Sequence, residues 1–340
     1  MLLGIGNPLL DLTVNGNAEL LKKYNLREND AIIAGDAQKS LYADLMENFD
    51  VKFTAGGSVQ NSLRVCQWIL KKPNICIFMG SVGKDKYSEI LKTEATADGV
   101  NVIYQYQDKV PTGTCAVIIT THQGNTRSLC ANLAAAERFT IDHIRTPENR
   151  KYVEQANFFY ISGFFLTVSP DTAYEIGKYA ATKNKVFITN LSAPFICDAF
   201  SDRVMKTLPY VDIVFGNESE ALTFSRKQKF GTTDLKDILL KIKNLPKENK
   251  NRSRMVIITQ GHHPVLLAKD NEVLELPVPP IPKELILDTN GAGDAFVGGF
   301  LSQFIQGKTL EKCIECANWA AAHIIQNSGC SFDKSISFAG

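Results

Sequence analysis

The sequence predicts an α/β fold of three layers, α/β/α, with a mostly parallel central sheet. Short β-rich runs alternate with helical patterns through most of the 340 residues. Several of these runs, such as ICIFMG, are continuously apolar, which is typical of strands covered by helices on both faces. Two longer stretches break the alternation, and they predict a smaller second layer inserted into the connections of the main sheet.

The expected elements follow from this rhythm in chain order. The predicted strands are residues 2–6, 75–83, 158–163, 185–192, 212–217 and 254–261. Helical patterns lie between them, for example at residues 85–97, 170–183 and 233–244.

The interrupting stretches mix polar and apolar residues in extended patterns, and one of them reads as a hairpin that turns at HQGN, residues 122–125. We interpret these stretches as a lid over the strand ends. The expected domains are a large catalytic domain of residues 1–10, 56–104 and 137–340 and a small discontinuous lid of residues 11–55 and 105–136. The basic segment LPKENKNRSR, residues 245–254, is expected to be a solvated surface loop.

Composition argues against several classes of partner. Lys and Arg total 37 against 36 acidic residues, so no bulk charge favours nucleic acid or an anionic membrane surface. No apolar run is long enough to span a bilayer, and no basic leader precedes the first glycine and proline. Eight cysteines within mostly apolar stretches are typical of reduced thiols. We expect a cytoplasmic monomer, with a nuclear pool left open.

The stretch DTNGAGDAFVGGFLSQF, residues 288–304, combines small residues with an acid where a helix is predicted to begin. The backbone N–H groups of Gly291, Ala292 and Gly293 can approach an anion there, and the helix dipole favours negative charge. Asp294 is then either an ordinary first-turn acid or a general base beside an anion site. Spacing alone leaves both interpretations open.

A second glycine-led helix start lies in AGGSVQNSLRVCQWIL, residues 55–70. Gly56 and Gly57 precede Ser58, which we expect to be the N-cap. Asn61 follows one turn later on the same side, where it could hydrogen-bond a hydroxyl of a sugar or polyol. The alternative interpretation is that these residues only form the turn before the helix and bind no ligand.

The segment FGNESEALTF, residues 215–224, places Asn217 at the end of a predicted strand and Glu220 in the first turn of a helix. Polar groups at the carboxyl ends of parallel strands are where open α/β sheets bind ligands. The two residues could hold magnesium-bound water near phosphates, or they could form a capping box.

Three rival motifs fail on their spacing or context. SQFIQGKT, residues 302–309, lacks the first glycine of a phosphate-binding loop and joins two helices. GIGNPL, residues 4–9, has Leu9 where a dinucleotide-binding turn needs glycine. Cys313 and Cys316 form a lone C-x-x-C without a second pair, so packing on one helix face is the favoured interpretation.

Taken together, the two glycine-led helix starts and the N-x-x-E motif resemble the signature segments of the ribokinase-like family of sugar and nucleoside kinases. Further segments are similar to the members that phosphorylate adenosine: GNPLLD (6–11), PTGTCA (111–116), RSLCANLAAA (127–136), SGFFLTVSP (162–170), NLSAPF (190–195) and PYVDIVFGNE (209–218). This resemblance implies a three-layer domain with a small α/β lid. It also implies ATP-dependent, Mg²⁺-requiring phosphorylation of the adenosine 5'-hydroxyl, which gives AMP and ADP.

The resemblance also implies roles for matched residues. Asp294 would receive the hydroxyl proton beside an anion hole formed by residues 291–293, and Arg127 would close over the phosphates with the lid. Asp11, Gly57 and Asn61 would bind the ribose. The implied substrate contacts are Asn7, Leu9, Asp11, Gly56, Gly57, Ser58, Asn61, Cys115, Leu129, Ala131, Leu133, Phe164, Phe195 and Asn290. The implied ATP-side contacts are Asn217, Thr259 and Gly261, with magnesium held through water by Asn217 and Glu220.

Two alternatives remain at this point. One is a kinase of the same family that acts on a free sugar or another nucleoside. The other is a nucleoside-binding protein that has lost catalysis, although intact Asp294, Asn217 and Glu220 argue against it.

Overall fold

The computed structural model describes residues 1–120, 126–270 and 272–339, and it divides the chain into two compact units. Unit 1 comprises Met1–Gly6 and Phe139–Pro280, and unit 2 comprises Asn7–Arg138 and Ile281–Gly340. These bounds differ from those expected for a large domain and a lid, and that functional division stays a prediction.

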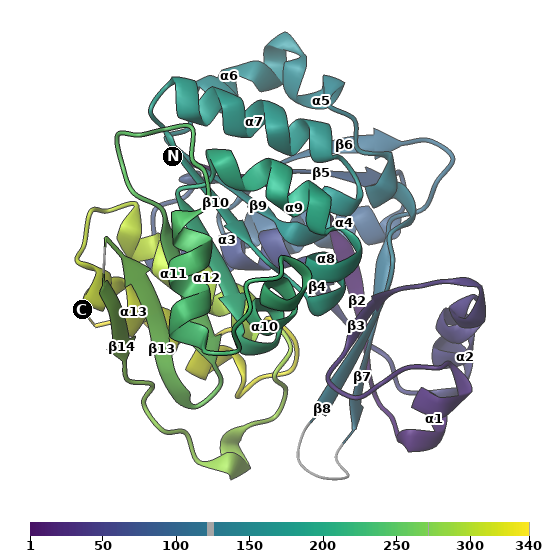
Figure 1. Cartoon of the computed structure of the whole chain (residues 1–340). Coiled ribbons are helices and arrows are strands. Elements are labelled where there is room, and N and C mark those ends of the chain that lie inside the picture. The colour runs from purple at the N-terminus through teal and green to yellow at the C-terminus, as the bar shows by residue number, and fades with distance from the viewer. Residues whose placement is uncertain (121–125, 271, 340) are drawn as a thin grey trace. The chain divides into compact units, whose positions relative to one another are not determined.

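Unit 1 is built on a sheet with the strand order β14-β13-β12-β11-β10-β9-β1 (Figure 1). Its strands are β1 (Leu2–Ile5), β9 (Phe158–Ser162), β10 (Val186–Asn190), β11 (Ile213–Asn217), β12 (Met255–Gln260), β13 (His263–Lys269) and β14 (Glu272–Leu276). Its α-helices are α5 (Asp142–Arg145), α6 (Pro147–Gln155), α7 (Pro170–Thr182), α8 (Pro194–Ala199), α9 (Ser201–Thr207), α10 (Glu218–Lys227) and α11 (Leu235–Asn244). Short 3₁₀ turns cover Gly163–Thr167 and Leu208–Tyr210.

Strands β1, β9, β10, β11 and β12 run parallel, and β13 and β14 are added antiparallel at one edge. The central strands are almost wholly buried, as their continuous apolar runs predict. The expected α/β fold with a mostly parallel sheet is confirmed, and each of the six predicted strands is present within one or two residues of its expected bounds.

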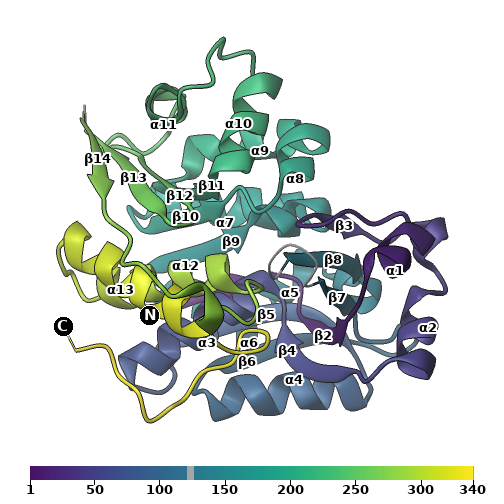
Figure 2. The same ribbon diagram turned by 90° about the horizontal axis from the view of Figure 1, so that it is seen from below.

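Unit 2 contains a parallel pair, β5 (Cys76–Gly83) and β6 (Asn101–Gln107), and a separate sheet with the order β3-β8-β7-β2-β4. The strands of that second sheet are β2 (Leu9–Asn15), β3 (Ala31–Ile33), β4 (Lys52–Gly56), β7 (Thr114–Thr120) and β8 (Thr126–Asn132). The helices are α1 (Ala18–Lys23), α2 (Leu41–Asn48), α3 (Ser58–Leu70), α4 (Lys86–Ala97), α12 (Ala292–Phe304) and α13 (Leu310–Ile324). Short 3₁₀ turns cover Asp36–Gln38, Ala134–Arg138 and Lys283–Leu285. Helix α12 packs against both α3 and α13 (Figure 2).

The five-stranded sheet of unit 2 has one face covered by its own helices. Helices α1 and α2 lie beside β7 and β8 in Figure 1, at the lower right. Buried residues of these elements and of β2 form one apolar cluster, which includes Val14, Leu20, Leu45, Ile118 and Cys130. The antiparallel β7–β8 pairing agrees with the expected hairpin, whereas the expected HQGN turn lies outside the described residues. The opposite face carries Asp11 and Cys115, which are buried as well.

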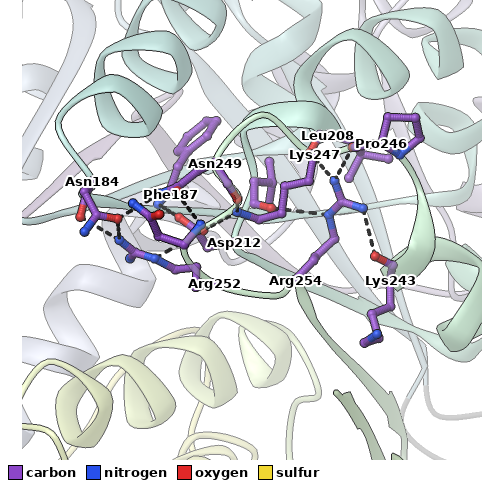
Figure 3. Close-up of polar contacts among 12 residues, drawn as sticks. Asn184, Phe187, Leu208, Asp212, Lys243, Pro246, Lys247, Asn249, Arg252 and Arg254 are labelled. Carbon is purple, nitrogen blue, oxygen red and sulfur yellow. Dashed lines mark hydrogen bonds and ion pairs between the residues drawn. The ribbon is translucent and has the colours of Figure 1, made fainter. Parts of the chain in front are cut away.

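The expectation that the charges of residues 245–254 are solvated was wrong for two of them. Arg254 is 1% exposed, and Lys247 forms an ion pair with the buried Asp212 at 2.8 Å. Figure 3 shows the two basic side chains directed into a cluster of backbone and side-chain oxygens. Charge counting could not reveal this, because Arg254 donates to backbone carbonyls within residues 208–211 and 242–246, and Lys247 pairs with the distant Asp212.

The rejected motifs behave as ordinary structure. Cys313 and Cys316 are buried within α13, and the GKT segment joins α12 to α13. Among residues 1–120, 126–270 and 272–339, no cluster of three or more His, Cys, Asp or Glu side chains could hold a metal ion. Over the same ranges, the helices all fall short of the length and apolarity that crossing a bilayer requires.

Candidate active site

Asp294 lies in the first turn of α12, which begins after Gly291 adopts a left-handed conformation with φ of 80°. The Ser58 hydroxyl donates to one oxygen of its carboxylate at 2.7 Å. The side-chain amide of Asn61 donates to the other oxygen at 3.1 Å. Beside this carboxylate, a Cβ atom on Gly293 would meet no other atom within 4 Å, so the first turn is open where a ligand could approach.

The environment of Asp294 makes it a stronger base than a solvated aspartate. Burial raises the pKa of its carboxyl group from 3.8 to about 6, while hydrogen bonds from Ser58 and Asn61 and the positive charge of Arg127 act in the opposite direction. A base with this pKa is mostly ionised at pH 7 and still accepts a proton readily.

The glycine-led start of α3 differs in one respect from the sequence-based prediction. The N-cap is Gly57, with φ of 93°, and Ser58 is the first residue inside the helix. The prediction that Ser58 is the N-cap was wrong. A side chain at residue 57 would place Cβ 2.3 Å from the carbonyl oxygen of Asn7, so only glycine fits. Freed from capping, the Ser58 hydroxyl is committed to Asp294.

Asp11 brings a second buried carboxylate to this region. It lies on β2, is 5% exposed and accepts a long hydrogen bond of 3.4 Å from the side-chain amide of Asn290. A Cβ atom on Gly56 would lie 2.2 Å from an Asp11 oxygen, so the carboxylate packs directly against the end of β4. The structure thus brings together the candidate residues on β2, β4, α3 and α12.

Asp11 is held in an environment that disfavours its charge. Burial raises the pKa of the Asp11 carboxyl group to about 7, and the negative charge of Asp294 is the next largest cause. Asp288 also raises the pKa, whereas Asn290 and Arg64 lower it. A nearly buried carboxylate with one long hydrogen bond is a strong acceptor for ligand hydroxyl groups.

This burial predicts a stability gain in Asp11→Asn. A carboxyl group whose folded pKa lies above its unfolded value binds more protons in the folded state, so its stabilising effect is lost as the pH rises from about 4 through about 7. At pH 8 the Asn variant should therefore be more stable than the parent by about 1 to 3 kcal/mol.

Denaturant unfolding at pH 5 and pH 8 measures this difference. Asp50→Asn, at an exposed position, is the matched control and should change stability little at either pH. An Asp11 variant that is less stable than the parent at pH 8 would contradict the conclusion that burial disfavours the charge of the Asp11 carboxylate.

The remaining candidates of the five-stranded sheet lie on the face opposite α1 and α2. Register pairs Asp11 with Cys115, and Cys115 with Ala131. Because side chains alternate along a strand, Arg127 and Leu129 of β8 lie on that same face. The opposite face carries Ile118 and its neighbours, which pack on α1 and α2. The other candidates in this part of unit 2, Asn7, Leu9 and Leu133, are buried next to these strands.

Arg127 is a partly buried cation on this face. Its Nε is buried and has no hydrogen-bond partner within the ranges that the structure describes. Its positive charge favours the ionised forms of Asp294 and Cys115. A buried guanidinium N–H without an acceptor is a site at which an anionic ligand would be stabilised.

The turn at residues 288–291 is supported by contacts that the sequence did not reveal. Asp288 is 2% exposed and accepts backbone N–H groups from Asn290 and Gly329, each at 2.7 Å. A Cβ atom on Gly291 would lie 3.1 Å from Cβ of Cys330, so the C-terminal segment packs behind the turn. The one available sequence signal was the placement of Asp288 two residues before Asn290, which is the spacing of an Asx turn.

In unit 1, Asn217 and Glu220 form a capping box at the start of α10. The Glu220 carboxylate accepts from the backbone N–H of Asn217 at 2.9 Å and from its side-chain amide at 2.8 Å. Glu220 is 4% exposed. These oxygen atoms would hold a magnesium ion through its water ligands. Direct coordination is disfavoured, because it would replace the capping hydrogen bonds. The capping box, which was the alternative to a magnesium site, is therefore present. Magnesium binding by Asn217 and Glu220 stays a prediction.

The other candidates of unit 1 lie at the carboxyl ends of its parallel strands. Thr259 is the register partner of Asn217, and Gly261 follows β12 directly. Phe164 and Phe195 follow β9 and β10, with ring centroids 6.1 Å apart. This is the edge at which open α/β sheets bind ligands.

Comparison with known proteins places this arrangement in a family. The model of the pfkB family of carbohydrate kinases matches residues 27–336. The chain belongs to the pfkB family of carbohydrate kinases. Adenosine kinase 2 of Arabidopsis thaliana is 49% identical over 338 residues, which cover 99% of this chain and 97% of that protein.

Solved structures of pfkB-family relatives agree in fold. The Anopheles gambiae adenosine kinase, in complex with P1,P4-di(adenosine-5) tetraphosphate, has a TM-score of 0.96 and 49% identity, and the match covers 100% of this chain and 99% of that chain. The Schistosoma mansoni adenosine kinase, in complex with 2-fluoroadenosine, has a TM-score of 0.94 and 33% identity, with 98% of each chain covered. The ribokinase-like α/β fold expected for this pfkB-family chain is confirmed over nearly its whole length.

Proposed function

We propose that this chain is an adenosine kinase, which transfers the γ-phosphoryl group of ATP to the 5'-hydroxyl of adenosine and releases AMP and ADP. The observation that carries the proposal is the Asp294 carboxylate, held by Ser58 and Asn61 at the open first turn of α12. The proposal is supported by relatives named adenosine kinases at up to 49% identity over nearly the whole chain.

In this mechanism Asp294 accepts the proton of the 5'-hydroxyl as the oxygen attacks phosphorus, and ADP leaves with the bridging oxygen. Backbone N–H groups at the start of α12, from residues 291–293, stabilise the charge of the group in transfer. The negative charge of Asp294 does not repel that of the transferred phosphoryl group, because Asp294 becomes neutral as it takes up the proton.

The nucleoside would be bound by the groups around this base. Asp11 would accept hydrogen bonds from ribose hydroxyls, and Asn61 would contact the same sugar. The candidates on the face of the five-stranded sheet opposite α1 and α2 would contact the adenine, and Phe164 and Phe195 would contact it as well. We propose that this sheet acts as the lid and that its closure excludes water from the reaction.

On the nucleotide side, Thr259 and Gly261 would contact ATP. Asn217 and Glu220 would hold water ligands of a magnesium ion. When bound, that ion would neutralise charge on the phosphates. A cytoplasmic monomer that forms AMP by purine salvage completes the proposal.

The test is ADP release with adenosine, inosine, guanosine and ribose measured in parallel. We expect adenosine to have the highest kcat/KM. A preference for ribose would favour a sugar kinase of the same family and would leave Phe164 and Phe195 as core residues. Adenosine binding without ATP consumption would favour a nucleoside-binding protein that has lost catalysis.

Arg127→Ala is predicted to reduce turnover more than adenosine affinity. The guanidinium is expected to meet the phosphates in the closed state, so its loss should lower kcat by roughly 10- to 100-fold while the Kd for adenosine changes less than about threefold. Steady-state kinetics and adenosine titration measure the two quantities. A large loss of affinity with unchanged turnover would remove Arg127 from phosphate binding.

A further inference from the structure

Both oxygens of the Asp294 carboxylate are held from the first turn of a different helix. Ser58 and Asn61 lie on α3, whereas Asp294 lies on α12. The Ser58 hydroxyl donates a hydrogen bond to one oxygen, and the Asn61 amide donates to the other. With both oxygens engaged from one side, the carboxylate is fixed in its rotation as well as in its position.

The contact between the two helices keeps this arrangement rigid. A Cβ atom on Gly298 of α12 would lie 2.5 Å from the backbone oxygen of Ser62 and 2.8 Å from Cβ of Val65. The backbone of α12 therefore rests directly on α3, and no side chain separates them. Val65 and Ala295 belong to one buried apolar cluster beside this contact. The distance between the two first turns is thus set by close packing.

The charges that face Asp294 come from several elements. Arg127 of β8 favours its ionised form, as do the hydrogen bonds from Ser58 and Asn61, and these oppose the effect of burial on its pKa. Asp11 of β2 and Cys330 of the C-terminal segment are the acidic groups that interact with it, and burial raises the pKa of the Cys330 thiol. Arg64 of α3 acts on Asp11 and Cys330.

Asn61 has a further acceptor atom. Its side chain is 3% exposed, its amide nitrogen is used by Asp294, and its Oδ1 has no hydrogen-bond partner in the described part of the chain. A buried carbonyl oxygen of this kind is satisfied when a ligand hydroxyl donates to it. Asn61 can therefore contact a substrate hydroxyl while it holds the carboxylate.

We propose that Ser58 is a positioning residue that, together with Asn61, orients the Asp294 carboxylate and keeps it ionised before the substrate binds. This inference rests on the proposed function. It adds a role that the resemblance does not give to Ser58, which was expected to contact the substrate. Neither residue takes the proton; they act through Asp294.

The test compares Ser58→Ala with Ser58→Thr and with Ser302→Ala. Threonine keeps the hydroxyl. Ser302 is a buried serine of α12 whose hydroxyl donates to the backbone oxygen of Gly299, so its replacement removes a comparable hydrogen bond away from Asp294. The readouts are kcat and KM for adenosine from pH 5 to pH 9, with the melting temperature of each variant.

Loss of a hydrogen bond to the ionised form should raise the pKa of Asp294, so we expect the acidic limb of the kcat/KM profile to move up by about one pH unit in Ser58→Ala. Turnover should fall about fivefold at pH 6 and largely recover at pH 8, with KM changed less than about threefold. Ser58→Thr and Ser302→Ala should keep the limb of the parent.

A Ser58→Ala enzyme with an unmoved acidic limb would overturn the proposal, and so would an equal loss of turnover at every pH. Should that variant be too unstable to assay, Ser58→Cys decides the same question, because a thiol occupies similar space but donates only weakly, so the limb should still move up. Failure of the proposed function is distinguishable, since the parent enzyme itself would then show no phosphorylation of adenosine.

Discussion

Replacing Asp294 with asparagine is expected to lower kcat by about 10²- to 10⁴-fold while adenosine binding is largely kept. Asparagine has nearly the same shape, but its amide cannot accept the hydroxyl proton. In the parent enzyme, kcat/KM should fall as the pH drops through about 6, because the carboxyl group of Asp294 is protonated below its pKa. Steady-state kinetics and adenosine titration of the Asn variant test both statements.

The matched control is Asp171→Asn. Asp171 is also an acid in the first turn of a helix, α7, but it is exposed. If Asp294 were an ordinary first-turn acid, both changes would cost only about 0.3 to 1 kcal/mol of stability and would leave turnover intact. A near-normal kcat for the Asp294 variant would therefore remove this residue from the mechanism.

Replacing Arg254 with methionine is expected to lower the free energy of unfolding by about 3 to 5 kcal/mol. The guanidinium donates to six backbone carbonyls, including those of Ile242, Lys243 and Leu245 at the end of α11. Burial lowers the pKa of Arg254 to about 10, and the negative charge of Asp212 acts in the opposite direction. Methionine fills similar space but donates to none of these carbonyls. Among the described residues, only the carbonyls of Leu208 and Ile242 keep a backbone donor outside regular helix pairing.

Denaturant unfolding should rank the variants. Arg254→Lys should also be destabilised, because lysine offers three donors in place of the planar guanidinium fork. Lys250→Ala, at an exposed position in the same segment, should remain within about 0.5 kcal/mol of the parent. An Arg254→Met protein as stable as the Lys250 variant would show that the buried hydrogen bonds contribute little.

The sequence predicted the features that local patterns encode. Continuous apolar runs located the central strands, and helical spacing placed the start of α12 at Gly291 with Asp294 in its first turn. The glycine pair before α3 was found for the same reason. These features depend on residues a few positions apart, which is the range over which periodicity and capping rules operate.

Contacts between distant segments could not be predicted in this way. Ser58 and Asp294 are 236 positions apart, and nothing in either local pattern indicates that they pair. Ser58 looked like an N-cap because serine is favoured there, whereas a left-handed Gly57 took that position. The buried Arg254 was hidden in a segment that is basic overall, since its acceptors are backbone atoms without a sequence signature.

The central claim is that the Asp294 carboxylate receives the proton of the adenosine 5'-hydroxyl at the start of α12. A crystal structure with adenosine and a non-hydrolysable ATP analogue tests it most directly, through the distance from the carboxylate to the 5'-oxygen. We predict a hydrogen bond of about 2.6 to 3.2 Å, with the γ-phosphate at the first turn of the helix. A carboxylate turned away from the ribose, with the 5'-oxygen held by another group, would contradict the account.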